Sequence, residues 1–159
     1  AILFAKTFDQ IGYKPPVIIG RAGFDYPEFY TLGELVEGVF MDCDGGYWSA
    51  TKLKDITEID NAMMERQGYH VTAGQLKEYA AFWFVIQCIE KAGTLDPYKL
   101  MDVMKMSYYP KGSVPGVPYG FKFDENGENT LQDTMIVQLV NGTYLPVWPL
   151  EYAEVEPTI

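Results

Sequence analysis

Two pairs of neighbouring carboxylates are the first side chains in this sequence that could do chemistry. Asp42 and Asp44 stand two positions apart, and Asp124 and Glu125 are adjacent. A pair of carboxyl groups can supply the general acid and the nucleophile or base of a hydrolase, as in glycoside hydrolysis. The second pair lies in a polar stretch that ends in Asn-Gly, which is typical of a solvated turn. A hydrolase that uses either pair is therefore one interpretation of the sequence.

A second group of candidate residues directly follows the apolar run Val17-Ile-Ile-Gly20. The run predicts a short buried strand of a parallel sheet, and ligands bind such sheets outside the carboxyl ends of the strands. Arg21 could bind an anionic group there in bidentate fashion, or it could be a solvated surface side chain. The residues that we take as candidate ligand contacts in this turn are Arg21, Ala22, Gly23, Phe24 and Asp25.

Asp25 has a structural interpretation as well. Glu28 follows it by three positions, which is the spacing of a capping box, and we expect Asp25 to cap the next helix. Tyr47 and Trp48 complete the candidate ligand contacts, because an aromatic pair in a loop could stack on a flat ligand. Packing at a hinge is the alternative for this pair.

The rest of the chain contains few residues that could form a catalytic or metal site. The only histidine is His70, and the two cysteines are Cys43 and Cys88. This set is too small for a site built on Cys and His ligands, so we expect no metal and no cofactor. We expect Cys88 to be a buried apolar residue of a helix, whereas Cys43 falls in a predicted loop and could be reactive.

The composition favours a folded domain that avoids nucleic acid. The chain has 159 residues, of which 48% are hydrophobic, and its net charge is -10. Such a charge repels phosphate backbones, so nucleic acid is not an expected partner. The apolar stretches are too short to cross a bilayer, and we find no cleavable leader in these residues.

The order of predicted elements narrows the fold. Residues 1–42 are predicted to form helix, strand, helix, strand, and Gly45-Gly46 then marks a loop that suits a domain crossing. Three helices follow, the first ending at Gly68, the second starting at a Thr72/Gln75 capping box and the third at Asp96-Pro97. The second helix is apolar over much of its circumference, so we expect it to be centrally packed. Two hairpins close the chain, the last with its turn at Asn141-Gly142.

This ordered set of segments resembles the carboxyl-terminal half of the type I periplasmic solute-binding proteins of ABC transporters, in the branched-chain amino acid (Leu/Ile/Val-binding) group. The segments that carry the resemblance are Gly12-Tyr-Lys-Pro15, Gly33-Glu-Leu-Val-Glu-Gly-Val-Phe40, Glu90-Lys-Ala-Gly-Thr-Leu-Asp-Pro97, Phe121-Lys-Phe-Asp-Glu-Asn-Gly127 and Val137-Gln-Leu-Val-Asn-Gly142. Each segment is a weak signal alone, but their order is specific.

The resemblance implies an α/β fold of two Rossmann-like lobes joined by crossing strands, with a small solute bound in the cleft between the lobes. It implies a non-enzymatic receptor, periplasmic or extracellular, whose partners are the solute, a membrane permease and a missing amino-terminal half of the same protein. On this basis we assign residues 1–42 to the carboxyl-terminal lobe, 43–51 to the hinge, 52–116 to the amino-terminal lobe and 117–159 to the returning hairpin and final strands.

The resemblance also bears on the solute. In amino-acid-binding members, the turn after the strand carries a carboxylate that pairs with the ligand's ammonium group, and Ala22 stands at the matching position here. We therefore favour an organic acid that Arg21 binds, with an aromatic or amide group, over an ordinary α-amino acid. An amino-acid-like solute is the alternative, in which Asp25 replaces the lost carboxylate. A ligand-sensing regulator or receptor ectodomain on the same fold is the alternative within this class.

Overall fold

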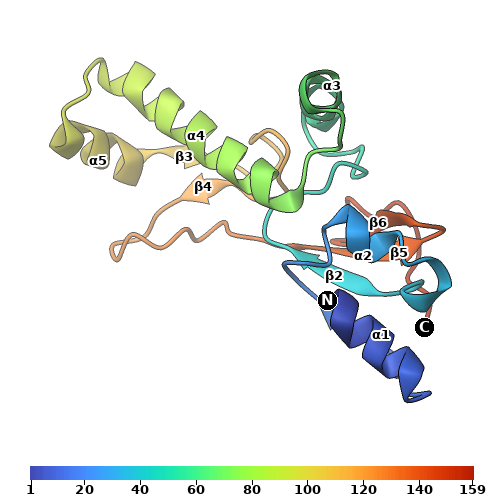
Figure 1. Ribbon diagram of the computed structural model, residues 1–159. Helices are drawn as coiled ribbons and strands as arrows, with labels where there is room; N and C mark the ends of the chain where they lie inside the picture. Colours follow the sequence, from blue (N-terminus) through green and yellow to red (C-terminus); the bar gives the residue numbers. More distant parts are fainter. The chain divides into compact units, whose positions relative to one another are not determined.

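The computed structural model describes residues 1–159, which divide into two compact units (Figure 1). Unit 1 consists of residues 1–43 and 135–159, and unit 2 of residues 44–134. Residues 117–134, which we grouped with the tail from the sequence, lie in unit 2. The assignment of the units to lobes of a longer protein stays a prediction.

Unit 1 is built on a four-stranded sheet in the order β1-β2-β5-β6. The strands are β1 (Ile19–Gly20), β2 (Phe40–Cys43), β5 (Met135–Val140) and β6 (Thr143–Trp148). β1 and β2 pair in parallel, as predicted, and β5 and β6 add to β2 as an antiparallel hairpin. Asn141 and Gly142 both have positive φ, 51° and 76°, which is the backbone that a tight two-residue turn requires. The predicted hairpin is confirmed.

The helices of unit 1 differ in one respect from the sequence prediction. α1 (Ile2–Gln10) forms as predicted, and Gly12 follows it with a φ of +66°. The expected second helix is split into α2 (Pro27–Tyr30) and the 3-10 helix η1 (Gly33–Leu35). Gly33 has a φ of +66°, outside the right-handed helical region, so α2 does not continue through it.

Unit 2 contains three longer helices and a two-stranded sheet. The helices are α3 (Ile56–Gln67), α4 (Ala73–Ala92) and α5 (Pro97–Met106), and β3 (Tyr108–Tyr109) pairs antiparallel with β4 (Phe121–Lys122). The predicted caps are present: Thr72 and Gln75 form a capping box, and Asp96 accepts hydrogen bonds from the N–H groups of Tyr98 and Lys99. None of the helices is both long and apolar enough to cross a membrane.

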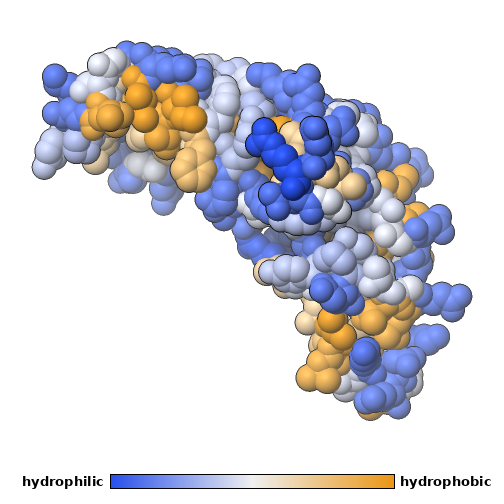
Figure 2. All heavy atoms as spheres, turned by 45° about the horizontal axis from the view of Figure 1, so that its top comes forward, coloured by the Kyte–Doolittle hydropathy of each residue, from blue (hydrophilic) through white to orange (hydrophobic).

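The core of unit 2 forms on one face of α4 only. Ala80, Phe84 and Cys88 pack against the segment that follows β3, where Val114, Val117, Tyr119 and Phe121 are buried. The expectation that α4 is centrally packed is wrong for these residues, because nothing covers its opposite face, where Phe82 is 68% exposed. Apolar side chains accordingly gather on the surface over α4 and α5 (Figure 2).

Candidate functional site

The carboxyl ends of β1 and β2 lie at the same edge of the sheet, because the two strands are parallel. Gly20 pairs with Met41, so one further step along each strand brings Arg21 beside Asp42. The turn that follows β1 is closed by a hydrogen bond of 3.0 Å from the Phe24 N–H to the Arg21 carbonyl. Gly23 has a φ of +90°, which permits this tight turn.

The Phe24 ring folds back over the end of β1. A Cβ at Gly20 would lie 2.2 Å from this ring, so only glycine leaves room for it. The ring also packs on Phe29 with centroids 4.4 Å apart. Phe24 thus anchors the turn to the core of unit 1, while Arg21 and Ala22 are exposed.

Three charged groups meet at this edge. The Arg21 Nη1 atom lies 3.7 Å from Asp42 Oδ2. Asp25, Asp42 and Arg21 all act electrostatically on the thiol of Cys43, the last residue of β2. The Arg21–Asp42 ion pair therefore stands at the carboxyl edge of the sheet, and the Asp25 carboxylate acts on Cys43 at the end of β2, so these three groups carry one net negative charge.

Asp25 does not cap the helix that follows it, so the predicted capping box is wrong. The N-cap of α2 is Tyr26, which makes no side-chain capping bond, because Pro27 takes the first helical position and moves the start of the helix. The Asp25 carboxylate instead lies near two tyrosines. Burial first, and then the negative charge of Asp25, raises the pKa of Tyr30 and of Tyr144.

Cys43 is not the loop cysteine that the sequence predicted. It ends β2 and is buried, with 1% of its surface exposed. Burial, followed by the charges of Asp25 and Asp42, raises the pKa of its thiol well above the usual range. A thiol in this state is a poor nucleophile, because the thiolate is the reactive form.

The aromatic pair of candidate contacts, Tyr47 and Trp48, belongs to unit 2, whereas the turn after β1 belongs to unit 1. Tyr47 is buried, and Trp48 stacks flat on His70, with ring centroids 3.8 Å apart and planes at 5°. His70 Nδ1 is 2.8 Å from Asp60 Oδ2, and Asp60 also accepts a hydrogen bond from the Val71 N–H. Sequence reasoning missed this cluster, because its members are far apart in the chain without any regular spacing.

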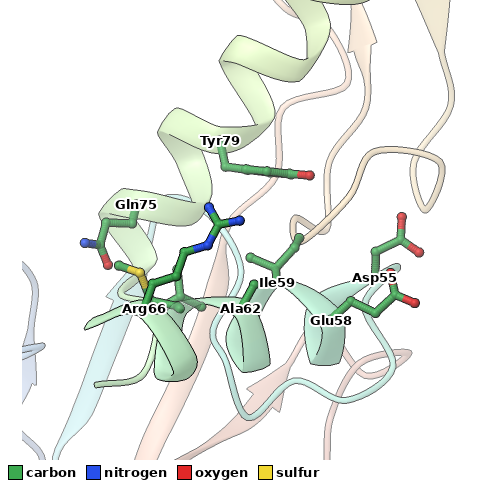
Figure 3. Close-up of a pocket in the computed structure, with 9 residues that line it drawn as sticks. Asp55, Glu58, Ile59, Ala62, Arg66, Gln75 and Tyr79 are labelled. Atoms are coloured by element: carbon green, nitrogen blue, oxygen red, sulfur yellow. The ribbon is translucent and has the colours of Figure 1, made fainter. Parts of the chain in front are cut away.

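A groove of about 500 Å³ separates α3 from α4 in unit 2. Its floor is apolar, and Arg66 extends from α3 toward the Tyr79 ring on α4, while Asp55 and Glu58 stand at the other end (Figure 3). None of the sequence-predicted site residues lines this groove. The residues that line it are Asp55, Glu58, Ile59, Ala62, Met63, Arg66, Val71, Gln75 and Tyr79.

The carboxylates that could have served a hydrolase have structural contacts. Asp42 pairs with Arg21, and Asp44 pairs with Lys77 at 3.4 Å. Asp124 accepts hydrogen bonds of 2.9 Å from the N–H groups of Asn126 and Glu128, so it holds its own turn.

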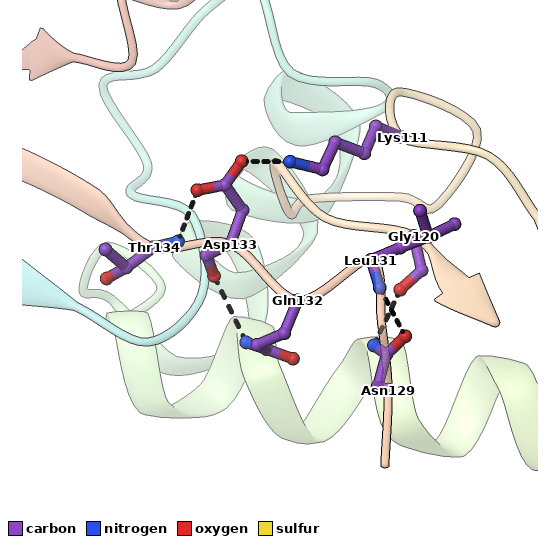
Figure 4. Close-up of polar contacts among 7 residues, drawn as sticks. All are labelled: Lys111, Gly120, Asn129, Leu131, Gln132, Asp133 and Thr134. Carbon is purple, nitrogen blue, oxygen red and sulfur yellow. Dashed lines mark hydrogen bonds and ion pairs between the residues drawn. The ribbon is translucent and has the colours of Figure 1, made fainter. Parts of the chain in front are cut away.

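Hydrogen bonds and an ion pair also hold the segment that follows this turn, residues 129–134 (Figure 4). Asp133 forms an ion pair with Lys111, and Asn129 donates a hydrogen bond of 2.8 Å to the Gly120 carbonyl. No observation at these carboxylates favours a hydrolytic site.

Known proteins with similar sequences and folds are solute-binding proteins. A relative in Brucella abortus (strain 2308), "Leu/Ile/Val-binding protein homolog 8", is 26% identical over 155 residues, which is 94% of this chain and 38% of the relative. The structure of a leucine-binding protein from Thermotoga maritima matches with a TM-score of 0.68 and 23% identity, over 91% of this chain and 39% of that one. The branched-chain amino acid transporter substrate-binding protein of Streptococcus pneumoniae, solved with isoleucine, matches with a TM-score of 0.63 and 13% identity, over 89% and 38%. No protein-family model matches the chain.

The chain has the fold of a type I periplasmic-binding protein. The resemblance to the Leu/Ile/Val-binding group is thereby confirmed, and the chain spans about 38% of the length of the curated relative. In open parallel sheets, ligands bind outside the carboxyl ends of the strands. In unit 1 that edge carries Arg21, Asp25 and Asp42.

Proposed function

We propose that this chain is part of an extracytoplasmic solute-binding receptor of an ABC importer, which captures an amino-acid-like solute and delivers it to a membrane permease. In this proposal the edge formed by Arg21, Asp25 and Asp42 binds the ammonium group of the solute. The observation that carries the proposal is the Arg21–Asp42 ion pair at the carboxyl ends of β1 and β2, to which Asp25 adds a second negative charge.

The charge at this edge supports one class among the solutes that the sequence left open. A free carboxylate on the solute would meet Arg21, but Asp42 lies 3.7 Å from the guanidinium and offsets its charge. An ammonium group would meet Asp25 and Asp42, with donors for both carboxylates and attraction from the excess negative charge. An amino group on the solute is thus favoured over a purely anionic organic acid, and the carboxylates take the place of the acidic residue that Ala22 lacks.

Solute capture in this proposal depends on an equilibrium between an open and a closed form of a hinged receptor. A solute that contacts both lobes of the complete protein binds the closed form more tightly, and this difference in affinity drives closure. The permease then recognises the closed, loaded receptor. Such receptors work outside the cytoplasmic membrane, so we place the protein in the periplasm or on the cell exterior.

Isothermal titration of the full-length polypeptide with three probes tests the proposal. Leucine carries both an ammonium and a carboxylate group, 4-methylpentanoate lacks the ammonium group, and isopentylamine lacks the carboxylate. We expect leucine to bind, and 4-methylpentanoate to bind at least about tenfold more weakly because it offers no ammonium group to Asp25 and Asp42. Tighter binding of 4-methylpentanoate would overturn the ammonium assignment. The absence of binding and of thermal stabilisation across a broad panel of amino acids, amides and organic acids would overturn the receptor function.

A further inference from the structure

The groove between α3 and α4 carries opposite charges at its two ends. Arg66 extends toward the Tyr79 ring at one end, and Asp55 and Glu58 stand at the other (Figure 3). The side chains of Arg66 and Glu58 form no ion pair and no hydrogen bond within the chain. Asp55, in contrast, pairs with Lys54 at 3.9 Å, so part of its charge is offset. One guanidinium and one carboxylate are therefore available to a ligand.

The middle of the groove is apolar, and contacts behind it fix its shape. The floor is formed by Ile59, Ala62, Met63 and Val71. The Val71 N–H donates a hydrogen bond of 2.9 Å to Asp60, and Asp60 also lies 2.8 Å from the Nδ1 atom of His70. Trp48 stacks on the other side of this group, on the His70 ring. The groove is thus held open by the protein itself, so a ligand does not have to order it on binding.

The spacing of the two charges sets the length of the ligand. Glu58 and Arg66 are eight positions apart on α3, so their Cα atoms are separated by about 12 Å along the helix axis. A free amino acid carries its ammonium and carboxylate groups on one carbon atom and cannot reach both ends. An extended peptide spans about 3.3–3.6 Å per residue, so about three or four residues separate its terminal charges by this distance. The groove volume of about 500 Å³ also suits a ligand of this size.

We propose that the groove binds a free oligopeptide of about three or four residues, with its amino terminus at Glu58 and its terminal carboxylate at Arg66. Apolar side chains of the peptide pack on the floor between the two charges. A fatty acid would also satisfy Arg66, but its apolar end would lie beside the carboxylates of Asp55 and Glu58. An internal segment of a protein carries neither terminal charge. The proposal goes beyond the proposed function, because this second site lies within unit 2 and does not depend on the solute bound at the edge of unit 1.

Isothermal titration of the full-length polypeptide with the tetrapeptide Ala-Leu-Leu-Ala tests the proposal. We expect the peptide to bind, and acetylation of its amino terminus or amidation of its carboxyl terminus to weaken binding at least about tenfold each. Saturation with leucine should leave the peptide affinity unchanged, because leucine is assigned to unit 1. The proposal is overturned if the peptide does not bind, if leucine displaces it, if blocking the termini has no effect, or if octanoate binds more tightly. None of these results alters the titration with leucine alone, which tests the proposed function separately.

Substitutions in the groove give an independent measurement. Arg66→Gln and Glu58→Gln should each weaken binding of the unmodified peptide at least about tenfold. Lys105→Gln is the matched control, because Lys105 is likewise the basic residue in the last turn of its helix but lies outside the groove. Ala62→Trp should fill the groove and abolish binding, whereas Asn61→Trp, at the neighbouring exposed position, should not. Unchanged melting temperatures show that the variants are folded. Unchanged peptide affinity in Arg66→Gln and Ala62→Trp would overturn the proposal.

Discussion

Arg21 and Asp42 form an ion pair across the ends of two parallel strands, with Nη1 and Oδ2 3.7 Å apart. The Arg21 side chain is 58% exposed and that of Asp42 is 31% exposed, so water screens the attraction and the pair adds little to stability. In the proposed solute site, Asp42 reduces the attraction of Arg21 for an anion and offers a carboxylate to a cation.

Replacement of Asp42 by asparagine separates these effects. Asp42→Asn removes one carboxylate from the site, and we expect the affinity for leucine to fall by about 1.5–3 kcal/mol, or tenfold or more. The free energy of unfolding should change by less than about 0.5 kcal/mol. Calorimetric titration and urea unfolding of the full-length polypeptide measure the two quantities. Asp9→Asn, at an exposed position of α1, is the control. Unchanged leucine affinity in Asp42→Asn would show that Asp42 does not contact the solute.

Both cysteines should be protected from thiol reagents in the folded protein. Cys43 and Cys88 are 1% and 0% exposed, and burial raises the pKa of Cys43. Labelling then requires local or global opening, so we expect it to be on the order of a thousandfold slower than in the urea-unfolded chain. Colorimetric thiol titration with and without urea checks this. A rapid phase equal to one thiol in the folded protein would contradict the buried position of Cys43.

Two glycine substitutions should have opposite effects. Gly142 has a φ of +76° and open space around it, so Gly142→Ala costs about 1 kcal/mol through backbone strain alone. Gly74 lies in the first turn of α4 without positive φ, and a methyl group added there would lie 4.0 Å from its nearest neighbour, the Thr72 hydroxyl. Gly74→Ala should therefore stabilise the protein by about 0.5–1 kcal/mol. Urea unfolding followed by circular dichroism measures both, and equal changes in the two variants would argue against the turn at Asn141-Gly142.

Short-range signals account for the parts of the fold that the sequence predicted well. The turn at Asn141-Gly142 and the caps at Thr72 and Asp96 depend on a few adjacent residues, and all three are present. The parallel pairing of β1 with β2 was predictable because a helical segment separates two short apolar runs. The spacing of Asp25 and Glu28 predicts a cap that does not form, because Pro27 and the positive φ of Gly33 decide where that helix begins and ends.

Contacts between distant residues account for what the sequence did not predict. Trp48 stacks on His70, and His70 is bonded to Asp60, yet no spacing in the sequence links the three. The ion pair of Arg21 with Asp42 could have been found, because the register of two parallel strands places them side by side. The candidate contacts of the turn and those at Tyr47 and Trp48 fall in different units, so their joint role stays a prediction.

Gln138 in the centre of β5 should be important for the stability of unit 1. Its side chain is fully buried, donates hydrogen bonds to the carbonyls of Gly38 and Thr158, and accepts one from the Thr158 N–H. Gln138→Ala leaves these groups unsatisfied and opens a cavity, so we expect a loss of about 2–3 kcal/mol. Hydrogen exchange at Thr158 should accelerate with it. Gln132→Ala, at an exposed position, is the control, and an equal loss in both variants would contradict the role of the buried amide.

Alkaline unfolding should report on Tyr119. Burial, followed by the charge of Glu78, raises the pKa of Tyr119 from 10.0 to about 12. Below pH 10 the phenol is protonated in both the folded and the unfolded chain, so it has no effect on stability. Between pH 10 and about 12 the unfolded chain releases the proton first, so the stability of unit 2 falls as the pH rises.

Tyr119→Phe cannot ionise and should flatten this part of the pH profile, whereas Tyr98→Phe, at an exposed position, should leave it unchanged. Urea unfolding across this pH range measures the slopes. Identical slopes in wild type and Tyr119→Phe would show that the phenol of Tyr119 ionises as readily in the folded protein as in the unfolded chain.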